Sequence, residues 1–138
     1  MAAPGADAGG GAGGVVSKPS PHSVSDTVAK LVDLLGSKGV KVFAVIDQQA
    51  EARAVGLELR ETTLVIFGNP AGGTGVMVAA PLSALDLPLK VLVWAEDGQG
   101  TVVSYTAPAT LAARWGLTPE TAAALQVVNA LTDALVAA

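Results

Sequence analysis

The sequence lacks cysteine and contains a single histidine. Without cysteine it can form no disulfide, no thiolate metal site and no cysteine nucleophile. His22 alone cannot supply the pair of imidazoles that many metal sites use, so we predict no metal and no other cofactor. Because no residue near His22 would pair with it, a solvated loop residue is a simpler interpretation than a catalytic base.

Charge is scarce as well. Charged residues make up 14% of the chain, against roughly 25% in an average domain, and the net charge is −4. The eight Lys and Arg residues do not cluster, so no basic face is available to neutralise nucleic-acid phosphates. No apolar run reaches the roughly 18 residues of a membrane span, and no basic start precedes an apolar segment. We therefore expect a cytoplasmic protein with neither a nucleic-acid nor a membrane partner.

What the chain does have is apolar residues, which make up 51% of its 138 positions. This length suits one domain with a sizeable core. With so few charges, large apolar surfaces would remain after folding, and oligomerisation would cover them. The Gly/Ala-rich residues 1–14 have too little side-chain surface to fold, so we predict a disordered tail followed by one domain over residues 15–138.

Hydrophobic periodicity gives the order of elements. It predicts strands at 15–20, 40–46, 63–67, 87–95 and 101–106, and helices at 24–38, 48–55, 75–85, 108–114 and from 119 onward. This β-α-β-α-β-α-β-β-α order predicts an α+β fold: a five-stranded mixed, mainly antiparallel sheet with helices packed on it.

Local signals refine three of these elements. Apolar residues on both alternations of 40–46 predict a central strand that is covered on both sides. The run NPAGGTG at 69–75 predicts a loop before the following helix, which Pro81 should kink or break. Thr118 and Pro119 predict the start of one last helix.

The last two strands predict a hairpin. With its turn centred on residues 98–99, Trp94 would face Val103 and Leu92 would face Tyr105. The side chains of Lys90, Trp94 and Tyr105 would then project from one face of the sheet.

Three polar residues stand in apolar surroundings: Asn69, Asp86 and Lys90. A charge inside an apolar segment is costly unless it is paired. One hypothesis places all three around a ligand, with Trp94 and Tyr105 as an apolar wall. The alternatives are structural: Asn69 bonding its own backbone in a turn, an Asp86–Lys90 ion pair or dimer contact, and aromatic rings in the core.

Two other features carry weaker signals. The glycine run at 72–75 lacks the Gly-Lys-Ser/Thr of a phosphate loop, so a tight turn is the simpler interpretation. Asp47 follows a strand and is better explained as a helix cap than as a carboxylate base.

Several motifs together carry a family resemblance over residues 15–117. The chain resembles the bacterial and archaeal family called domain of unknown function 302. The residues that carry the resemblance are Gly39, KVFAVID (41–47), GLELR (56–60), LVIFGNP (64–70), ALDLPLKVLVWAED (84–97), SYTAP (104–108) and Leu117.

The resemblance implies a β-α-β(4)-α plan, a TATA-binding-protein-like fold and a homodimer, but no particular activity. The architectural likeness does not imply DNA binding, against which the acidic charge argues. Three hypotheses follow. The first is a homodimeric domain that binds a small molecule or anion around Asn69, Asp86 and Lys90. The second is an enzyme that uses Lys90 with Asp86. The third is a structural or interaction module with no ligand.

Overall fold

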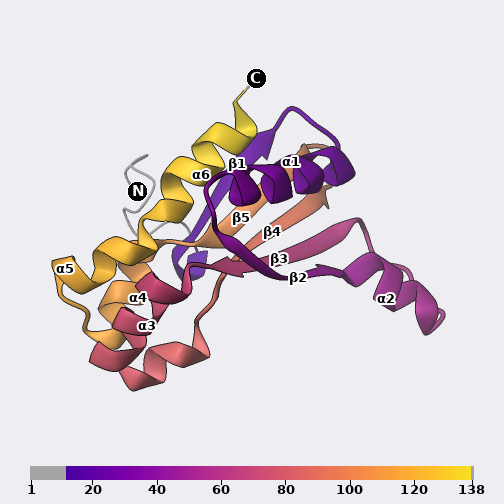
Figure 1. Ribbon diagram of the computed structural model, residues 1–138. Helices are drawn as coiled ribbons and strands as arrows, with labels where there is room; N and C mark the ends of the chain where they lie inside the picture. Colours follow the sequence, from indigo (N-terminus) through magenta and orange to yellow (C-terminus); the bar gives the residue numbers. More distant parts are fainter. Residues whose placement is uncertain (1–11, 138) are drawn as a thin grey trace.

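A computed structural model of the protein describes residues 12–137. Within them one antiparallel sheet has the strand order β1-β5-β4-β3-β2 (Figure 1). The strands are β1 (Val15–Ser20), β2 (Lys41–Asp47), β3 (Thr62–Gly68), β4 (Leu89–Glu96) and β5 (Gly100–Thr106). The α+β fold with a mainly antiparallel sheet is thus confirmed, and every pairing in this sheet is antiparallel. Of the tail predicted at 1–14, residues 1–11 lie outside the described part, and Ala12–Gly14 form a short 3-10 turn, η1.

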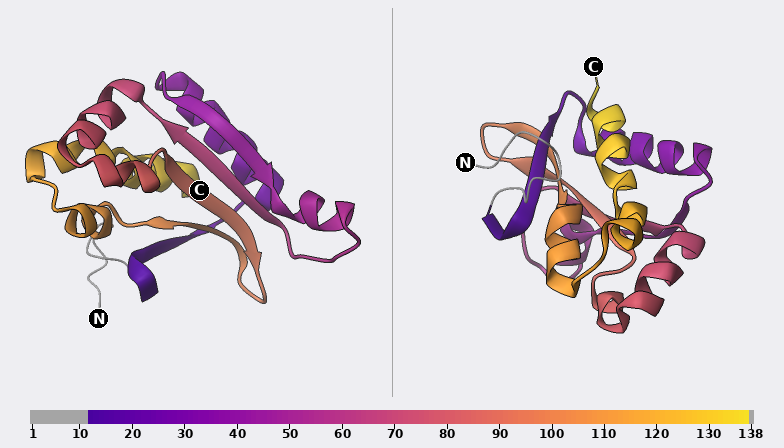
Figure 2. Two further views of the ribbon diagram at one scale, coloured as in Figure 1. Left: turned by 90° about the horizontal axis from the view of Figure 1, so that it is seen from below. Right: turned by 90° about the vertical axis from the view of Figure 1, so that its left-hand side faces the viewer.

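Two helices form a layer on one face of the sheet. Helix α1 contacts β2, β3 and β4, and α6 contacts β1 and α1. Helices α3, α4 and α5 gather at one end of the sheet, while α2 extends away at the other end (Figures 1 and 2). The helical segments are α1 (Val24–Ser37), α2 (Gln48–Ala54), α3 (Pro70–Ala79), η2 (Pro81–Leu85), α4 (Pro108–Trp115), α5 (Pro119–Ala122), η3 (Ala123–Leu125) and α6 (Val127–Val136).

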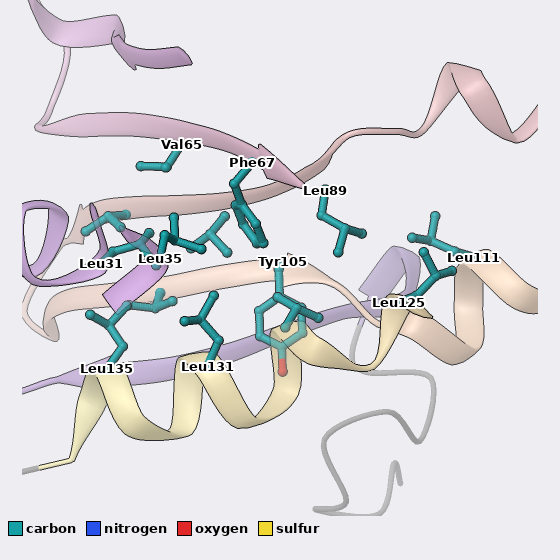
Figure 3. Close-up of a cluster of buried hydrophobic side chains, with 14 of the residues drawn as sticks. Leu31, Leu35, Val65, Phe67, Leu89, Tyr105, Leu111, Leu125, Leu131 and Leu135 are labelled. Atoms are coloured by element: carbon teal, nitrogen blue, oxygen red, sulfur yellow. The ribbon is translucent and has the colours of Figure 1, made fainter. Parts of the chain in front are cut away.

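The core lies between the sheet and this helical layer. Alternate residues of the strands point into it, because successive side chains of a strand project to opposite faces. Figure 3 shows Phe67 and Tyr105 pointing from the sheet toward the side of Leu131 and Leu135 of α6, with Val65 over Leu31 and Leu35 of α1. All of these residues are buried. No helix among the described residues combines the length and apolar character needed to cross a bilayer.

Strand β2 was predicted to be central, and this was wrong: it is an edge strand that pairs with β3 alone. The exposed fractions of Phe43 and Val45, at 45% and 47%, reflect the missing neighbour. A strand with apolar residues on both of its faces can be buried on both faces, but this pattern does not specify whether a second neighbouring strand pairs with it.

The predicted hairpin register was wrong by one residue. Val93 pairs with Val103, and Trp94 pairs with Val102. The reason is the turn: residues 97–99 form a three-residue connection in which Gly98 has a φ of +74°. A shift of one residue moves side chains to the opposite face. Tyr105 therefore faces the helices, while Lys90 and Trp94 project from the other face.

The other face of the sheet, which we call the open face, is mostly apolar over β2, β3 and β4, and it also carries the polar residues Lys90, Ser104 and Ser17. Cross-strand partners place the same alternation of every strand on it. None of its residues belongs to the core cluster. Its apolar residues, most of them partly exposed, are Ala44, Ile46, Leu64, Ile66, Leu92, Trp94 and Val102.

Most predicted helix ends are confirmed. Ser23 accepts a hydrogen bond from the Asp26 amide at 3.1 Å, and Gly39 follows α1 with a φ of +67°. Pro81 separates α3 from η2, as expected of a residue that interrupts a helix. The predicted loop at 69–75 was wrong, because α3 already begins at Pro70 and contains the glycine run.

The C-terminal helix was predicted as one piece, but it is divided into α5, η3 and α6. Thr118 caps its start as expected, accepting from the Thr121 amide at 3.2 Å. The tighter 3-10 turn changes which side chains face inward. Leu125 is buried at 3% exposure, whereas the neighbouring Ala124 is exposed.

Candidate functional site

A pocket of about 530 Å³ lies where the core meets the cluster of helices at the end of the sheet. Its walls come from the end of β3, the start of β4, the first turns of α3 and the η3 segment. Phe67, Leu89 and Leu125, each less than 10% exposed, form its floor. The floor is therefore an extension of the hydrophobic core (Figure 3).

The mouth of the pocket is more exposed. Phe43 and Val127 line it with 45% and 41% of their surface exposed. Lys38 and Asn69 also line it and are exposed. Among the described residues, Lys38 is the only charged one in the lining. No described residue bonds the Lys38 ammonium group.

The start of α3 builds one wall of the pocket. The Oδ1 of Asn69 accepts a hydrogen bond from the Ala71 amide at 3.0 Å, and Pro70 occupies the first helical position. Gly72 and Gly73 then contribute backbone alone to the wall. A Cβ added at Gly73 would meet no atom within 4 Å, so the missing side chain leaves open space there.

Asn69 thus combines two interpretations that the sequence left open. It caps a helix through its Oδ1, and it also lines the pocket. No described residue accepts a hydrogen bond from its Nδ2, which leaves that donor available at the mouth.

Asp86 lies outside the pocket, at the end of η2. Its Oδ2 accepts hydrogen bonds from Arg114 Nη1 at 2.8 Å and from Trp115 Nε1 at 2.7 Å. Partial burial, the largest single influence, raises the pKa of the Asp86 carboxyl. The hydrogen bonds from Trp115 and Arg114 and the charges of Arg114 and Lys90 outweigh it and lower that pKa below its ordinary value of 3.8. This carboxylate connects η2 to α4.

Lys90 is near Asp86 but does not form an ion pair with its carboxylate. Its Nζ donates to the backbone oxygens of Asp86 and Pro88 at 3.3 and 3.1 Å. It projects from the open face and does not line the pocket. The structure therefore brings Lys90 beside Asp86, and of the three residues only Asn69 lines the pocket.

The two aromatic candidates lie on opposite faces of the sheet. On the open face, Trp94 Nε1 donates to Ser104 Oγ at 3.0 Å. On the helix-covered face, where Figure 3 shows Tyr105, its hydroxyl donates to Asn129 Oδ1 at 2.9 Å. Neither residue lines the pocket.

Asp47 and His22 have structural surroundings. Asp47 Oδ1 accepts from the Ala50 amide at 2.9 Å, so the predicted helix cap is confirmed. His22 is partly buried, and its Nε2 has no hydrogen-bond partner among the described residues. In that part of the chain, no group of three or more His, Cys, Asp or Glu side chains is placed to hold a metal ion.

Sequence reasoning found one lining residue, Asn69, and missed the rest. Asn69 was visible because an Asn-Pro pair directly after a strand is a local signal. Lys38, Phe43 and Leu125 come from segments far apart in the chain, and only the tertiary fold brings them together. The Asn-Pro pair, taken as a helix start rather than a loop, would have placed the glycines correctly.

Two named bacterial proteins are similar in sequence to part of the chain. It is 42% identical over 105 residues to the "Fluoride-specific ion channel FluC 1" of Brucella suis and to that of Brucella abortus. The match covers 75% of this chain but only 41% and 38% of those proteins. This chain thus spans about two-fifths of the length of these curated relatives.

A solved structure supports the fold. The "uncharacterized conserved protein DUF302 from Bacillus stearothermophilus" superposes with a TM-score of 0.75, covering 90% of this chain and 96% of that one. At 17% identity this likeness shows the fold alone. A family model described as "Domain of unknown function DUF302" matches residues 16–138. Because that match covers most of the sequence, the chain belongs to the DUF302 family, whose function is unknown.

Proposed function

We propose that the protein is a homodimeric domain that binds a small, largely apolar molecule in the pocket. The observation that carries this proposal is the pocket itself. Its volume of about 530 Å³ falls within the roughly 300–1,000 Å³ of typical ligand sites. Its apolar floor and few polar groups at the mouth also match such sites, in which polar groups fix orientation.

Energetics favour an occupant of this kind. A ligand seated in the pocket would cover the apolar side chains of Phe43 and Val127 at the mouth. Each Å² of apolar surface removed from water contributes about 25 cal/mol. The Nδ2 of Asn69 would supply a directional contact.

A pair of glycine variants tests the proposal. Gly73→Leu adds a side chain at a residue that lines the pocket, whereas Gly75→Leu adds the same side chain in the same helix at a residue that does not line it. Neither added Cβ meets an atom within 4 Å. We expect a panel of alcohols, organic acids and nucleotides to include compounds that raise the melting temperature of the wild type and of Gly75→Leu.

In Gly73→Leu those shifts should disappear. Equal shifts in all three proteins would place binding elsewhere and contradict the proposal. The absence of any shift across the panel would also count against it.

The homodimer is proposed through the open face. A row of apolar residues there includes Leu64 and Leu92, which are partly exposed and lie on adjacent strands. Neither belongs to the buried core cluster of the described residues, and a continuous apolar patch on a sheet is typical of an interaction surface. A second copy of the chain would cover it by a two-fold contact.

Fluoride is a second candidate ligand, because the matched relatives carry "fluoride-specific" in their names. The same melting assay with sodium fluoride, and sodium chloride as control, tests it. We expect no fluoride-specific shift, because a small hydrated anion gains nothing from the apolar walls. A shift with fluoride alone would favour this second candidate over an apolar ligand.

Lys90 and Asp86 have weaker support as a catalytic pair. The ammonium group of Lys90 is engaged by two backbone carbonyls, and the carboxylate of Asp86 by Arg114 and Trp115. Both residues lie outside the pocket. The proposal therefore centres the site on the pocket beside Asn69.

A further inference from the structure

We propose that the ligand is an apolar organic monoanion, such as a carboxylate on a short hydrocarbon chain, whose head group binds at Lys38. This inference rests on the proposed function and specifies the chemistry of its ligand. It concerns one end of the pocket, where a cation lies beside otherwise apolar walls.

The charged residues of the lining indicate the sign of the ligand's charge. Lys38 is charged, and no acidic residue is among the described residues that line the pocket. A cationic ligand would meet a like charge and no counterion there. A second cation lies near the mouth, because the Nζ of Lys41 is 5.0 Å from the centre of the Phe43 ring. An anion is the complement of this arrangement.

Lys38 also differs from Lys18 and Lys90 in what its ammonium group contacts. Lys18 bonds to three acceptors, and Lys90 bonds to two backbone oxygens. For Lys38 the described residues supply no hydrogen-bond acceptor and no carboxylate. Its ammonium group is therefore available to a ligand without breaking an existing contact.

The difference in solvent exposure between the floor and the mouth of the pocket indicates how the ligand is oriented. Phe67 and Leu125 form a floor that is almost fully buried, whereas Lys38 is exposed at the mouth. An amphipathic molecule would place its apolar part on the floor and keep its head group partly hydrated beside Lys38. The Nδ2 of Asn69 is a further donor at the same mouth.

A structural explanation for Lys38 also exists. It caps the C-terminal end of α1, where a cation is favoured by the helix dipole. That explanation predicts an effect of Lys38 on stability but no dependence of ligand binding on the head group. The two accounts therefore differ in a measurable way.

Three probes of the same chain length separate them: octanoate, 1-octanol and octylammonium, titrated at pH 7 by calorimetry. We expect octanoate to bind about fivefold more tightly than 1-octanol, the upper end for a partly solvated ion pair. Octylammonium should bind most weakly. In about 1 M NaCl, where the screening length is about 3 Å, the preference for octanoate should shrink.

Variants assign the preference to Lys38. In Lys38→Met the affinity for octanoate should fall to that for 1-octanol, and in Lys38→Glu octylammonium should bind more tightly than octanoate. Lys30→Met is the matched control, because Lys30 lies on α1 and does not line the pocket. It should leave all three affinities unchanged.

The outcomes distinguish the two proposals. If all three probes bind equally, or octylammonium binds best, the inference fails while the apolar pocket stands. If none binds, or if binding persists unchanged in Gly73→Leu, the proposed function fails as well. The comparison of the three head groups in the wild type tests the inference about Lys38 without depending on the folding of any variant.

Discussion

Lys18 joins strand β1 to helix α6 through three hydrogen bonds from one ammonium group. Its Nζ donates to Thr132 Oγ1 and Asp133 Oδ1, both at 2.7 Å, and to the Asn129 carbonyl at 3.2 Å. It also lies 5.2 Å from the centre of the Tyr105 ring. The Lys18 side chain is only 14% exposed, whereas Asp133 is 67% exposed, so solvent screens the ion pair from the Asp133 side while the ammonium group itself is shielded.

We predict that Lys18→Met lowers the free energy of unfolding by about 1–3 kcal/mol, the range for losing hydrogen bonds to a charged group. Urea denaturation measures the change. Lys30→Met is the control, because the contact of Lys30 Nζ with the Ala137 carbonyl, at 3.5 Å, is long and exposed. That variant should stay within about 0.5 kcal/mol of the wild type. Equal effects of the two changes would contradict a special role for Lys18.

Asp86 predicts a pH dependence of stability. Its folded-state pKa is lowered, so the unfolded chain binds the proton more readily than the folded one. The contribution of Asp86 is therefore complete above its ordinary pKa of 3.8 and is lost as the pH falls through the lowered value. Asp86→Asn should destabilise the protein at pH 7 and make less difference at pH 3. A wild-type-to-variant difference in unfolding free energy that stays constant between these pH values would refute this account.

Single residues were predictable where the signal was local. Asp47 as a cap depends on three residues of sequence, and its hydrogen bond forms as expected. The partners of Asp86 are 28 and 29 positions away in Arg114 and Trp115, which no sequence pattern specified. Lys18, with partners more than 100 positions away, was invisible for the same reason.

At the scale of elements, helix α3 is unusual because its first six residues contain Gly72, Gly73 and Gly75. Glycine inside a helix costs about 0.5–1 kcal/mol relative to alanine, which is why the sequence favoured a loop there. The helix nevertheless starts at Pro70 behind the Asn69 cap, so tertiary contacts and capping outweigh propensity.

We predict that Gly75→Ala raises the free energy of unfolding by about 0.5–1 kcal/mol, because its Cβ meets nothing within 4 Å and helical backbone suits alanine. Gly98→Ala should instead lower it by about 1 kcal/mol or more, because Gly98 has a φ of +74° in the β4–β5 turn. Urea denaturation of both variants measures these opposite signs. Destabilisation by Gly75→Ala would show that this part of α3 is not an ordinary helix.

Elements were predictable in kind and order more than in position. Caps and breakers such as Thr118 and Pro81 act within a few residues, and they marked helix ends correctly. The neighbours of β2 and the register of the hairpin depend on pairing between strands, which periodicity does not encode. The register also depends on whether the β4–β5 connection has two or three residues. A difference of one residue moves the side chains of a strand to the opposite face of the sheet.

At the scale of the whole molecule, the sheet has one face under helices and one mostly apolar open face. This predicts self-association, which light scattering coupled to size-exclusion chromatography measures. Leu64→Glu, on the open face, should shift a dimer to a monomer that remains folded by circular dichroism. Val55→Glu is the control, because Val55 is 71% exposed and lies just after α2, away from the sheet face. A wild type that is monomeric at all concentrations would refute the dimer.

The fold class followed from the sequence because the order of elements restricts the arrangements that bury their apolar faces. The pocket did not, because four separated segments line it and only their packing creates the space. The proposed site is accordingly the pocket and does not include Asp86 or Lys90. Of the site residues that the sequence suggested, only Asn69 lines this pocket.

Titration of 1-octanol into the wild type, Gly73→Leu and Gly75→Leu tests the central claim most directly. This neutral probe depends on the apolar pocket and not on the charge of Lys38. We predict equal dissociation constants for the wild type and Gly75→Leu, and binding at least about tenfold weaker in Gly73→Leu, a difference of about 1.4 kcal/mol. Undiminished binding by Gly73→Leu, or none by the wild type, would contradict a ligand site in this pocket.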